Sequence, residues 1–145
     1  MCFTCQGLPH VCGGFQGATS NSNISDLCYR FDQEGLRWEQ YGKMTDKRDF
    51  VAYDHSPDWG LIISGGYDGD KYFEAVENTL DSLNFNSLPD LPKEQYIGCL
   101  AIVDEETLFA TGGKTNGIGD NETYIYRYSV IGNCIRPCVT PSFRH

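Results

Sequence analysis

Short apolar runs separated by polar turns recur along the whole chain. Three of the runs, Val11-Cys12, Leu61–Ser64 and Leu108–Thr111, each end in a pair of glycines. The glycine pairs are Gly13-Gly14, Gly65-Gly66 and Gly112-Gly113. Short apolar runs bounded by glycine and acidic turns predict β-strands rather than helices.

The spacing of the glycine pairs indicates a repeat. The pairs lie 52 and 47 residues apart, and the residues before the last two pairs align without gaps. Phe50–His55 aligns with Ile97–Ile102, and Leu61–Ile63 aligns with Leu108–Ala110. Each copy is an apolar strand, an acidic turn and a second apolar strand that ends in two glycines. Repeats of about 50 residues built from short strands are typical of β-propellers, which have four strands per blade.

The residues after each pair extend the repeat and carry a family resemblance. Leu27–Phe31 resembles Tyr124–Tyr128, Trp38 follows Phe31 by seven residues, and Phe85 takes the position of Trp38 in the second copy. These positions resemble kelch repeats, in which two glycines follow the second strand, a tyrosine lies in the third and a tryptophan in the fourth.

The resemblance implies an all-β fold of antiparallel four-stranded kelch blades in a β-propeller. It implies one complete and two incomplete blades, in a single region with units of about 8–44, 45–92 and 93–138 and irregular ends at 1–7 and 139–145. The expected strands are Leu8–Cys12, Asp26–Phe31, Arg37–Tyr41, Phe50–His55, Leu61–Ser64, Phe73–Leu80, Ser82–Leu88, Ile97–Val103, Thr107–Thr111, Thr123–Val130 and Asn133–Cys138.

Charge narrows the classes of partner. Eleven basic and 20 acidic residues give a net charge of −9, which disfavours binding to a nucleic-acid backbone. We find no apolar stretch long enough to span a membrane. Residues Met1–His10 lack the basic and apolar regions of a signal peptide.

The seven cysteines leave several interpretations open. Cys12 and Cys28 flank the first loop, on strands expected to be adjacent, where they form either a disulfide or two buried thiols. The terminal pairs Cys2/Cys5 and Cys134/Cys138 allow local disulfides, a zinc site or no shared role. Their spacing is far from that of known zinc modules, so we assign no metal and no cofactor.

Two glycosylation sequons begin at Asn23 and Asn121, both in loops between a second and a third strand. Together with the cysteines they favour an extracellular setting if the full-length protein carries a signal peptide, and a cytoplasmic one otherwise. The sequence does not fix the compartment.

The resemblance implies a non-catalytic interaction module that binds a protein or peptide through loops on one face. The expected loops are Phe15–Ser25, Thr45–Asp49, Tyr67–Phe73, Lys93–Tyr96 and Lys114–Glu122. Tyrosine and arginine dominate interface energetics. The candidate partner-binding residues are Arg48, Lys71, Tyr72, Tyr96 and Lys114.

An enzymatic function is the alternative. The histidines His10, His55 and His145 form no motif with a cysteine or carboxylate, so we predict no catalytic residue. The alternatives are a partial propeller of a kelch-type oxidase or sugar-modifying enzyme, or a non-functional fragment. Three stacked blades also leave unpaired edges and apolar end faces, which predicts self-association.

Overall fold

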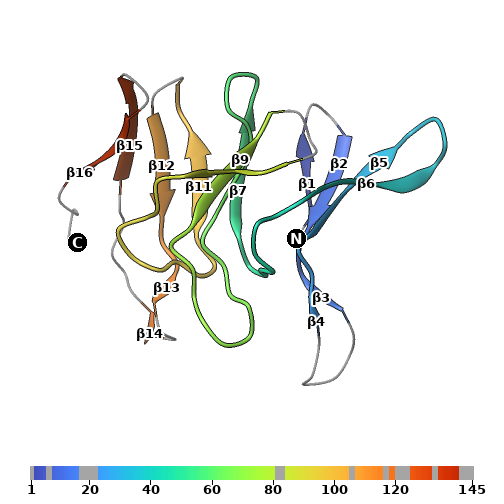
Figure 1. Ribbon diagram of the computed structural model, residues 1–145, viewed down its shortest axis with the longest axis horizontal. Coiled ribbons are helices and arrows are strands. Elements are labelled where there is room, and N and C mark those ends of the chain that lie inside the picture. The colour runs from blue at the N-terminus through green and yellow to red at the C-terminus, as the bar shows by residue number, and fades with distance from the viewer. Residues whose placement is uncertain are drawn as a thin grey trace.

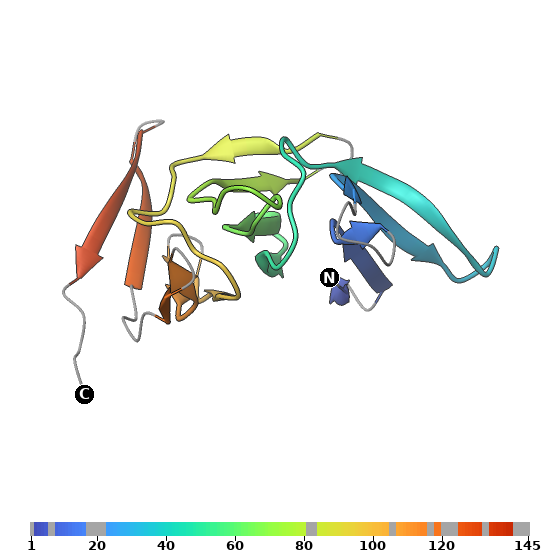
Figure 2. The ribbon, with the colours of Figure 1, turned by 90° about the horizontal axis from the view of Figure 1, so that it is seen from below.

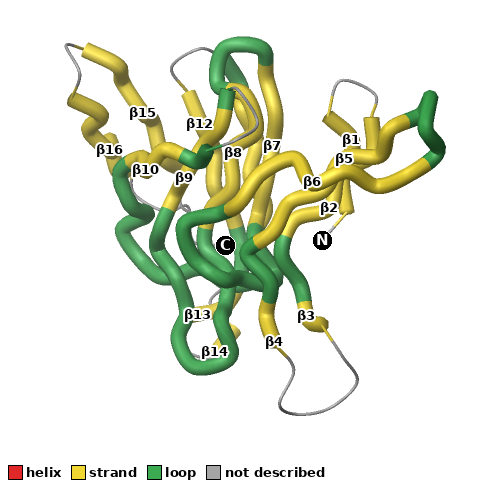
Figure 3. Tube along the Cα trace, turned by 45° about the vertical axis from the view of Figure 1, so that its right-hand side comes forward, coloured by secondary structure: helices red, strands yellow, loops and turns green. Residues whose placement is uncertain are grey.

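The computed structural model describes residues 2–5, 8–16, 23–80, 84–104, 107–115, 118–119, 125–131 and 134–140. Within these residues all the regular secondary structure is β-strand (Figure 3). The fold is therefore all-β with antiparallel sheets, as the short apolar runs and the repeat predict. We find no helix in the described segments that is long and apolar enough to cross a bilayer.

Three four-stranded sheets follow one another along the chain. The first contains β1 (Cys2–Cys5), β2 (Leu8–Cys12), β5 (Leu27–Asp32) and β6 (Arg37–Lys43). The second contains β7 (Ala52–Ser56), β8 (Gly60–Ser64), β9 (Val76–Thr79) and β10 (Asn86–Leu88). The third contains β11 (Cys99–Ile102), β12 (Thr107–Thr111), β15 (Ile125–Ile131) and β16 (Cys134–Thr140).

The prediction of one complete and two incomplete units is wrong, because all three sheets have four strands. The segment 1–7 was expected to be irregular, yet β1 pairs with β2 through the whole of Cys2–Cys5. A run of four residues was too short to predict a strand, and it forms a strand here because it pairs with β2. At the other end β16 extends to Thr140, beyond the expected boundary.

Two further ribbons project from one end of the sheets (Figure 1). One pairs β3 (Phe15–Gln16) with β4 (Asn23–Ile24), and the other pairs β13 (Lys114–Thr115) with β14 (Ile118–Gly119). Both lie within segments that the sequence predicted as plain loops. The loop between β8 and β9 projects from the same end (Figure 1).

The sheets lie side by side along an open arc (Figure 2). The fourth strands β6, β10 and β16 lie on the outer side of this arc, and the first strands lie toward its inner side. The described sheets do not close into a ring.

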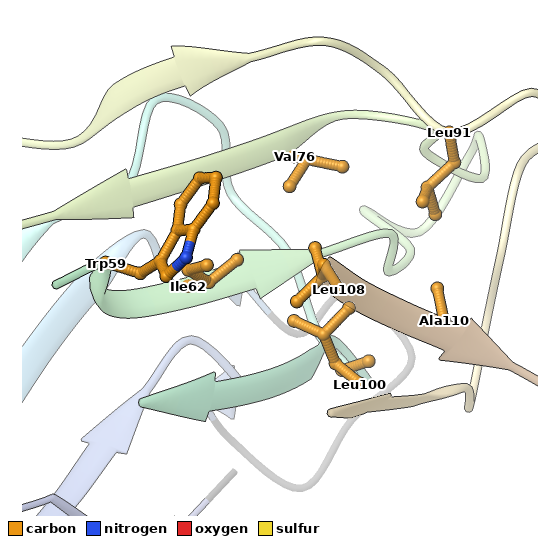
Figure 4. Close-up of a cluster of buried hydrophobic side chains, with 8 residues drawn as sticks. Trp59, Ile62, Val76, Leu91, Leu100, Leu108 and Ala110 are labelled. Atoms are coloured by element: carbon orange, nitrogen blue, oxygen red, sulfur yellow. The ribbon is translucent and has the colours of Figure 1, made fainter. Parts of the chain in front are cut away.

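Two apolar clusters hold neighbouring sheets together. Between the first and second sheets the buried residues are Cys12, Cys28, Met44, Val51, Leu61, Ile63 and Phe85. Between the second and third they are Ala52, Trp59, Ile62, Val76, Leu91, Leu100, Leu108 and Ala110 (Figure 4). Adjacent residues of β8 point to opposite neighbours, as strand geometry requires.

The glycine pairs permit a close approach between successive units. The second glycine of Gly13-Gly14 donates to the carbonyl of Arg48 at 3.3 Å, and that of Gly65-Gly66 donates to the carbonyl of Gln95 at 2.7 Å. A Cβ on the first glycine of either pair would collide with that same carbonyl oxygen. Both first glycines also have positive φ, +63° and +64°. Only glycine meets both conditions, which explains the repeat signal.

Cys12 and Cys28 form a disulfide in this structure. They face each other in the β2–β5 ladder, with Cα atoms 4.1 Å apart. This is slightly shorter than the range of about 4.4–6.8 Å usual for disulfides.

Burial of His10 makes the contact between the first two sheets sensitive to pH. Its Nδ1 lies 2.9 Å from the carbonyl of Leu8, and its ring meets Tyr41 edge-on at 4.9 Å. Burial, followed by the nearby charges of Arg30 and His55, lowers the pKa of His10, although the bond to Leu8 acts in the opposite direction. In the unfolded chain the histidine therefore binds its proton more readily.

We expect the free energy of unfolding to fall as the pH drops below about 6.5. Urea denaturation of the wild type and of His10→Gln between about pH 8 and pH 5 tests this. The decline should be shallower in the variant, because it has no imidazole to protonate at this position. An equal decline in both proteins would contradict the role given to His10.

Candidate functional site

Five aromatic side chains form a continuous cluster on the loop-bearing end of the sheets. They are Phe15, Phe50, Tyr67, Tyr72 and Tyr96, and we call them the aromatic cluster. Phe15 lies in β3 beside the first sheet, the next three belong to the second repeat, and Tyr96 precedes the first strand of the third sheet. The cluster therefore joins all three repeats.

The rings contact one another in sequence. Ring centroids are 6.2 Å apart for Phe15 and Phe50, and 4.9 Å for Phe50 and Tyr96. Tyr96 lies 5.5 Å from Tyr72 and 5.9 Å from Tyr67, and those two tyrosines are 4.8 Å apart. Most pairs are edge-on, the arrangement that the ring quadrupole favours. Phe15 is 49% exposed and the other four are partly exposed, so a partner can reach the cluster.

Backbone hydrogen-bonded pairs at equivalent positions of two repeats hold the cluster in place. Asp49 and Tyr67 exchange two main-chain hydrogen bonds, both 2.9 Å. Tyr96 and Lys114, each 47 residues further along, exchange two of 3.1 and 2.8 Å. The repeat thus forms the same backbone pair twice, once with Tyr67 and once with Tyr96.

The β8–β9 loop is fixed by its own polar groups. The Oδ1 of Asp68 accepts hydrogen bonds from the main-chain N–H groups of Asp70 at 2.9 Å and Lys71 at 2.8 Å. The hydroxyl of Tyr67 donates to the carbonyl of Gly69 at 2.6 Å. An Asx turn of this kind orders the loop, and Tyr72 then lies opposite Tyr67.

Phe50 adopts a backbone conformation that is rare for its residue type. Its φ is +54°, and its N–H donates to the Oδ1 of Asp49 at 2.7 Å. The equivalent residue, Ile97, also has positive φ, +57°, and donates to the carbonyl of Phe50 at 3.3 Å. Such strained residues gather at functional sites and persist only where their surroundings fix them.

The hydroxyl of Tyr96 has a raised pKa. Burial, followed by the proximity of Tyr72, Asp49 and Tyr67, raises the pKa of Tyr96 above its usual value of 10.0. The Tyr96 phenol therefore stays protonated over the physiological range.

A polar pocket of about 390 Å³ lies beside the aromatic cluster. Its lining residues are Asn23, Ile24, Asp46, Lys47, Asp68 and Phe73. The ammonium group of Lys71 lies 4.6 Å from the centroid of the Phe73 ring, a cation–π contact. Carboxylates and ammonium groups thus border the aromatic surface on this side.

The assignment of Arg48 to partner binding is wrong, because its side chain is completely buried. Its Nη2 forms an ion pair with the Oε1 of Glu77, which is 1% exposed, and its Nη1 donates to the carbonyls of Gly65 and Ala75, both at 3.1 Å. Burial lowers the pKa of Arg48 to about 10, so it remains charged at neutral pH. The Arg48 side chain therefore stabilises the second repeat internally.

The other four candidate residues remain accessible. Tyr72 and Tyr96 lie together in the cluster, while Lys71 and Lys114 are exposed beside it. Phe15, Phe50 and Tyr67 were not predicted from the sequence. A usable signal existed for two of them, since Phe15, Tyr67 and Lys114 each follow a glycine pair directly.

The remaining candidates fall in different places. Asn23 is exposed at the start of β4, whereas Asn121 and His145 lie outside the described residues. His10 lies in β2 of the first sheet and His55 in β7 of the second. In the part of the chain that the structure describes, histidine, cysteine and acidic side chains form no group of three that would hold a metal ion.

No protein-family model matches the chain, and no curated protein matches it significantly.

Proposed function

We propose that this chain is part of a kelch-type β-propeller and acts as a non-catalytic module that binds a protein or peptide partner. The aromatic cluster carries this proposal. Three consecutive four-stranded sheets arranged in an arc, with glycine pairs at equivalent positions, support the propeller assignment.

The chemistry of the aromatic cluster suits a protein surface as its ligand. Tyrosine offers a large apolar area with few side-chain torsions to restrict, together with a hydroxyl for hydrogen bonding. The rings are already packed against one another, so binding requires little further ordering. Lys71 and Lys114 at the border supply charged contacts.

Peptide selection tests the proposal. Random peptides displayed on phage are selected against the immobilised chain, and the retained sequences are synthesised and titrated by fluorescence anisotropy. We expect Tyr72→Ala/Tyr96→Ala to weaken their binding about 30-fold or more, as loss of interface hot spots does.

Leu80→Ala is the matched control, because Leu80 is an exposed apolar residue outside the cluster. It should leave peptide affinity unchanged, and thermal melts must show that every variant is folded. If the selected peptides bind the double variant as tightly as the wild type, the aromatic cluster is not the binding site.

A further inference from the structure

Each inner contact between sheets uses the same repeat positions. Leu61 and Ile63 of β8 are buried against the first sheet. Leu108 and Ala110, 47 residues later in β12, are buried against the second sheet. One face of each sheet therefore packs against the preceding sheet, and the other face is free to pack against the following one.

Among the described sheets, none packs on the face of the first sheet that corresponds to Leu61 and Ile63. Val11 occupies the position of Ile63, two residues before its glycine pair, and Trp38 occupies that of Phe85. Phe85 is 8% exposed, whereas Trp38 is 47% exposed. Val11, Tyr29 and Trp38 line an open apolar hollow of about 390 Å³. We call this surface the leading face.

The third sheet presents the face that, in the second sheet, packs against the following sheet. Phe109 stands at the position of Ile62, which is completely buried beneath the third sheet. Phe109 is only partly buried, and on the same face its ladder partner Ala101 and the nearby Cys99 are exposed. We call this surface the trailing face.

The glycine pair of the third sheet shows the same open position. At Gly65 a Cβ would collide with the main chain of Gln95, which belongs to the next repeat. At Gly112, with nearly the same φ of +66°, a Cβ would meet nothing within 4 Å. The trailing face therefore has the shape that receives a following repeat.

We propose that the leading face of one copy of this chain binds the trailing face of a second copy. The argument is continuity with the inner contacts, because the two faces carry the positions that already join the sheets to one another. A contact between two different faces is heterologous, and it gives a ring where the rotation between copies closes and an open filament where it does not. The three four-stranded sheets follow an arc (Figure 2), and two copies placed head to tail supply six sheets, within the four to eight blades typical of a propeller. The proposed assembly is therefore a closed dimer with two such contacts.

The net charge of −9 does not prevent this association. At physiological salt, repulsion between exposed charges fades beyond about 8 Å. The apolar faces themselves meet at contact distance, where removal from water favours binding. Exposed apolar surface of this kind marks interaction sites.

Sedimentation velocity of the 145-residue chain tests the proposal. We expect a dimer for the wild type and monomers for Trp38→Glu and for Phe109→Glu, since either substitution disrupts both contacts of the closed dimer. Mixing these two variants in equal amounts should restore a dimer through the one contact that remains intact, at higher total concentration than the wild type requires.

Leu80→Glu adds the same charge at an exposed apolar site of the central sheet and should remain dimeric. Thermal melts must show that each variant is folded. A monomeric wild type, a dimeric Phe109→Glu variant or a mixture that stays monomeric would overturn the head-to-tail contact, and a ladder of larger oligomers would overturn the closed dimer.

Discussion

Arg48→Leu is expected to lower the free energy of unfolding by about 3–5 kcal/mol, the usual cost of removing one member of a buried ion pair. The substitution leaves the carboxylate of Glu77 buried without its counter-ion. It also removes the donors to the carbonyls of Gly65 and Ala75. Urea denaturation at neutral pH, with the midpoint and slope compared with those of the wild type, measures the loss.

The double variant Arg48→Leu/Glu77→Leu separates charge from packing. Replacing a whole buried pair by apolar residues is often close to neutral, so the double variant should recover a large part of the loss. Part of the loss should remain, because the main-chain N–H of Thr45 donates to the Oε2 of Glu77 at 3.0 Å and loses this acceptor in the double variant. A single variant within about 1 kcal/mol of the wild type would contradict the structural role of Arg48.

Gly65→Ala is expected to destabilise the protein far more than Gly112→Ala, although the two glycines have almost the same φ. The left-handed conformation costs an alanine about 1–2 kcal/mol at either site. At Gly65 the added Cβ also collides with the carbonyl of Gln95, and overpacking of this kind adds about 1–3 kcal/mol. At Gly112 this second penalty is absent.

Both alanine variants are best compared in the Phe109→Glu background, so that association does not cover Gly112. Thermal and urea unfolding give the two differences in stability. Equal losses at the two sites would mean that backbone conformation alone, and not the approach of the next repeat, explains the glycine pairs.

The strands were largely predictable from the sequence because many are short apolar runs bounded by glycine or acidic turns. The predicted limits of Leu8–Cys12 and Thr107–Thr111 agree with β2 and β12. The predicted Phe73–Leu80 is longer than β9, because the main chain of Phe73 instead bonds to Gly66 and Gln95 near the loop-bearing end. Such non-local bonds leave no periodic trace in the sequence.

The candidate site was only partly predictable. Tyr72 and Tyr96 were identified from residue type and loop position, and the structure places them 5.5 Å apart. Arg48 was misassigned because a charged residue in a loop is usually solvated. Its burial depends on Glu77, 29 residues later, at a strand position equivalent to that of Tyr29 in the first sheet.

The sequence by itself determined the β-strands, the glycine pairs and the repeat, because these follow from local conformation and from apolar runs at a regular spacing. The tertiary structure decided which face of each sheet is covered, where Arg48 lies and which aromatic residues meet. Those features depend on contacts between residues tens of positions apart, and packing rather than local preference sets them. The exposure of the leading and trailing faces also depends on such contacts. Trp38 and Phe85 are both aromatic, yet only Phe85 is buried against a neighbouring sheet.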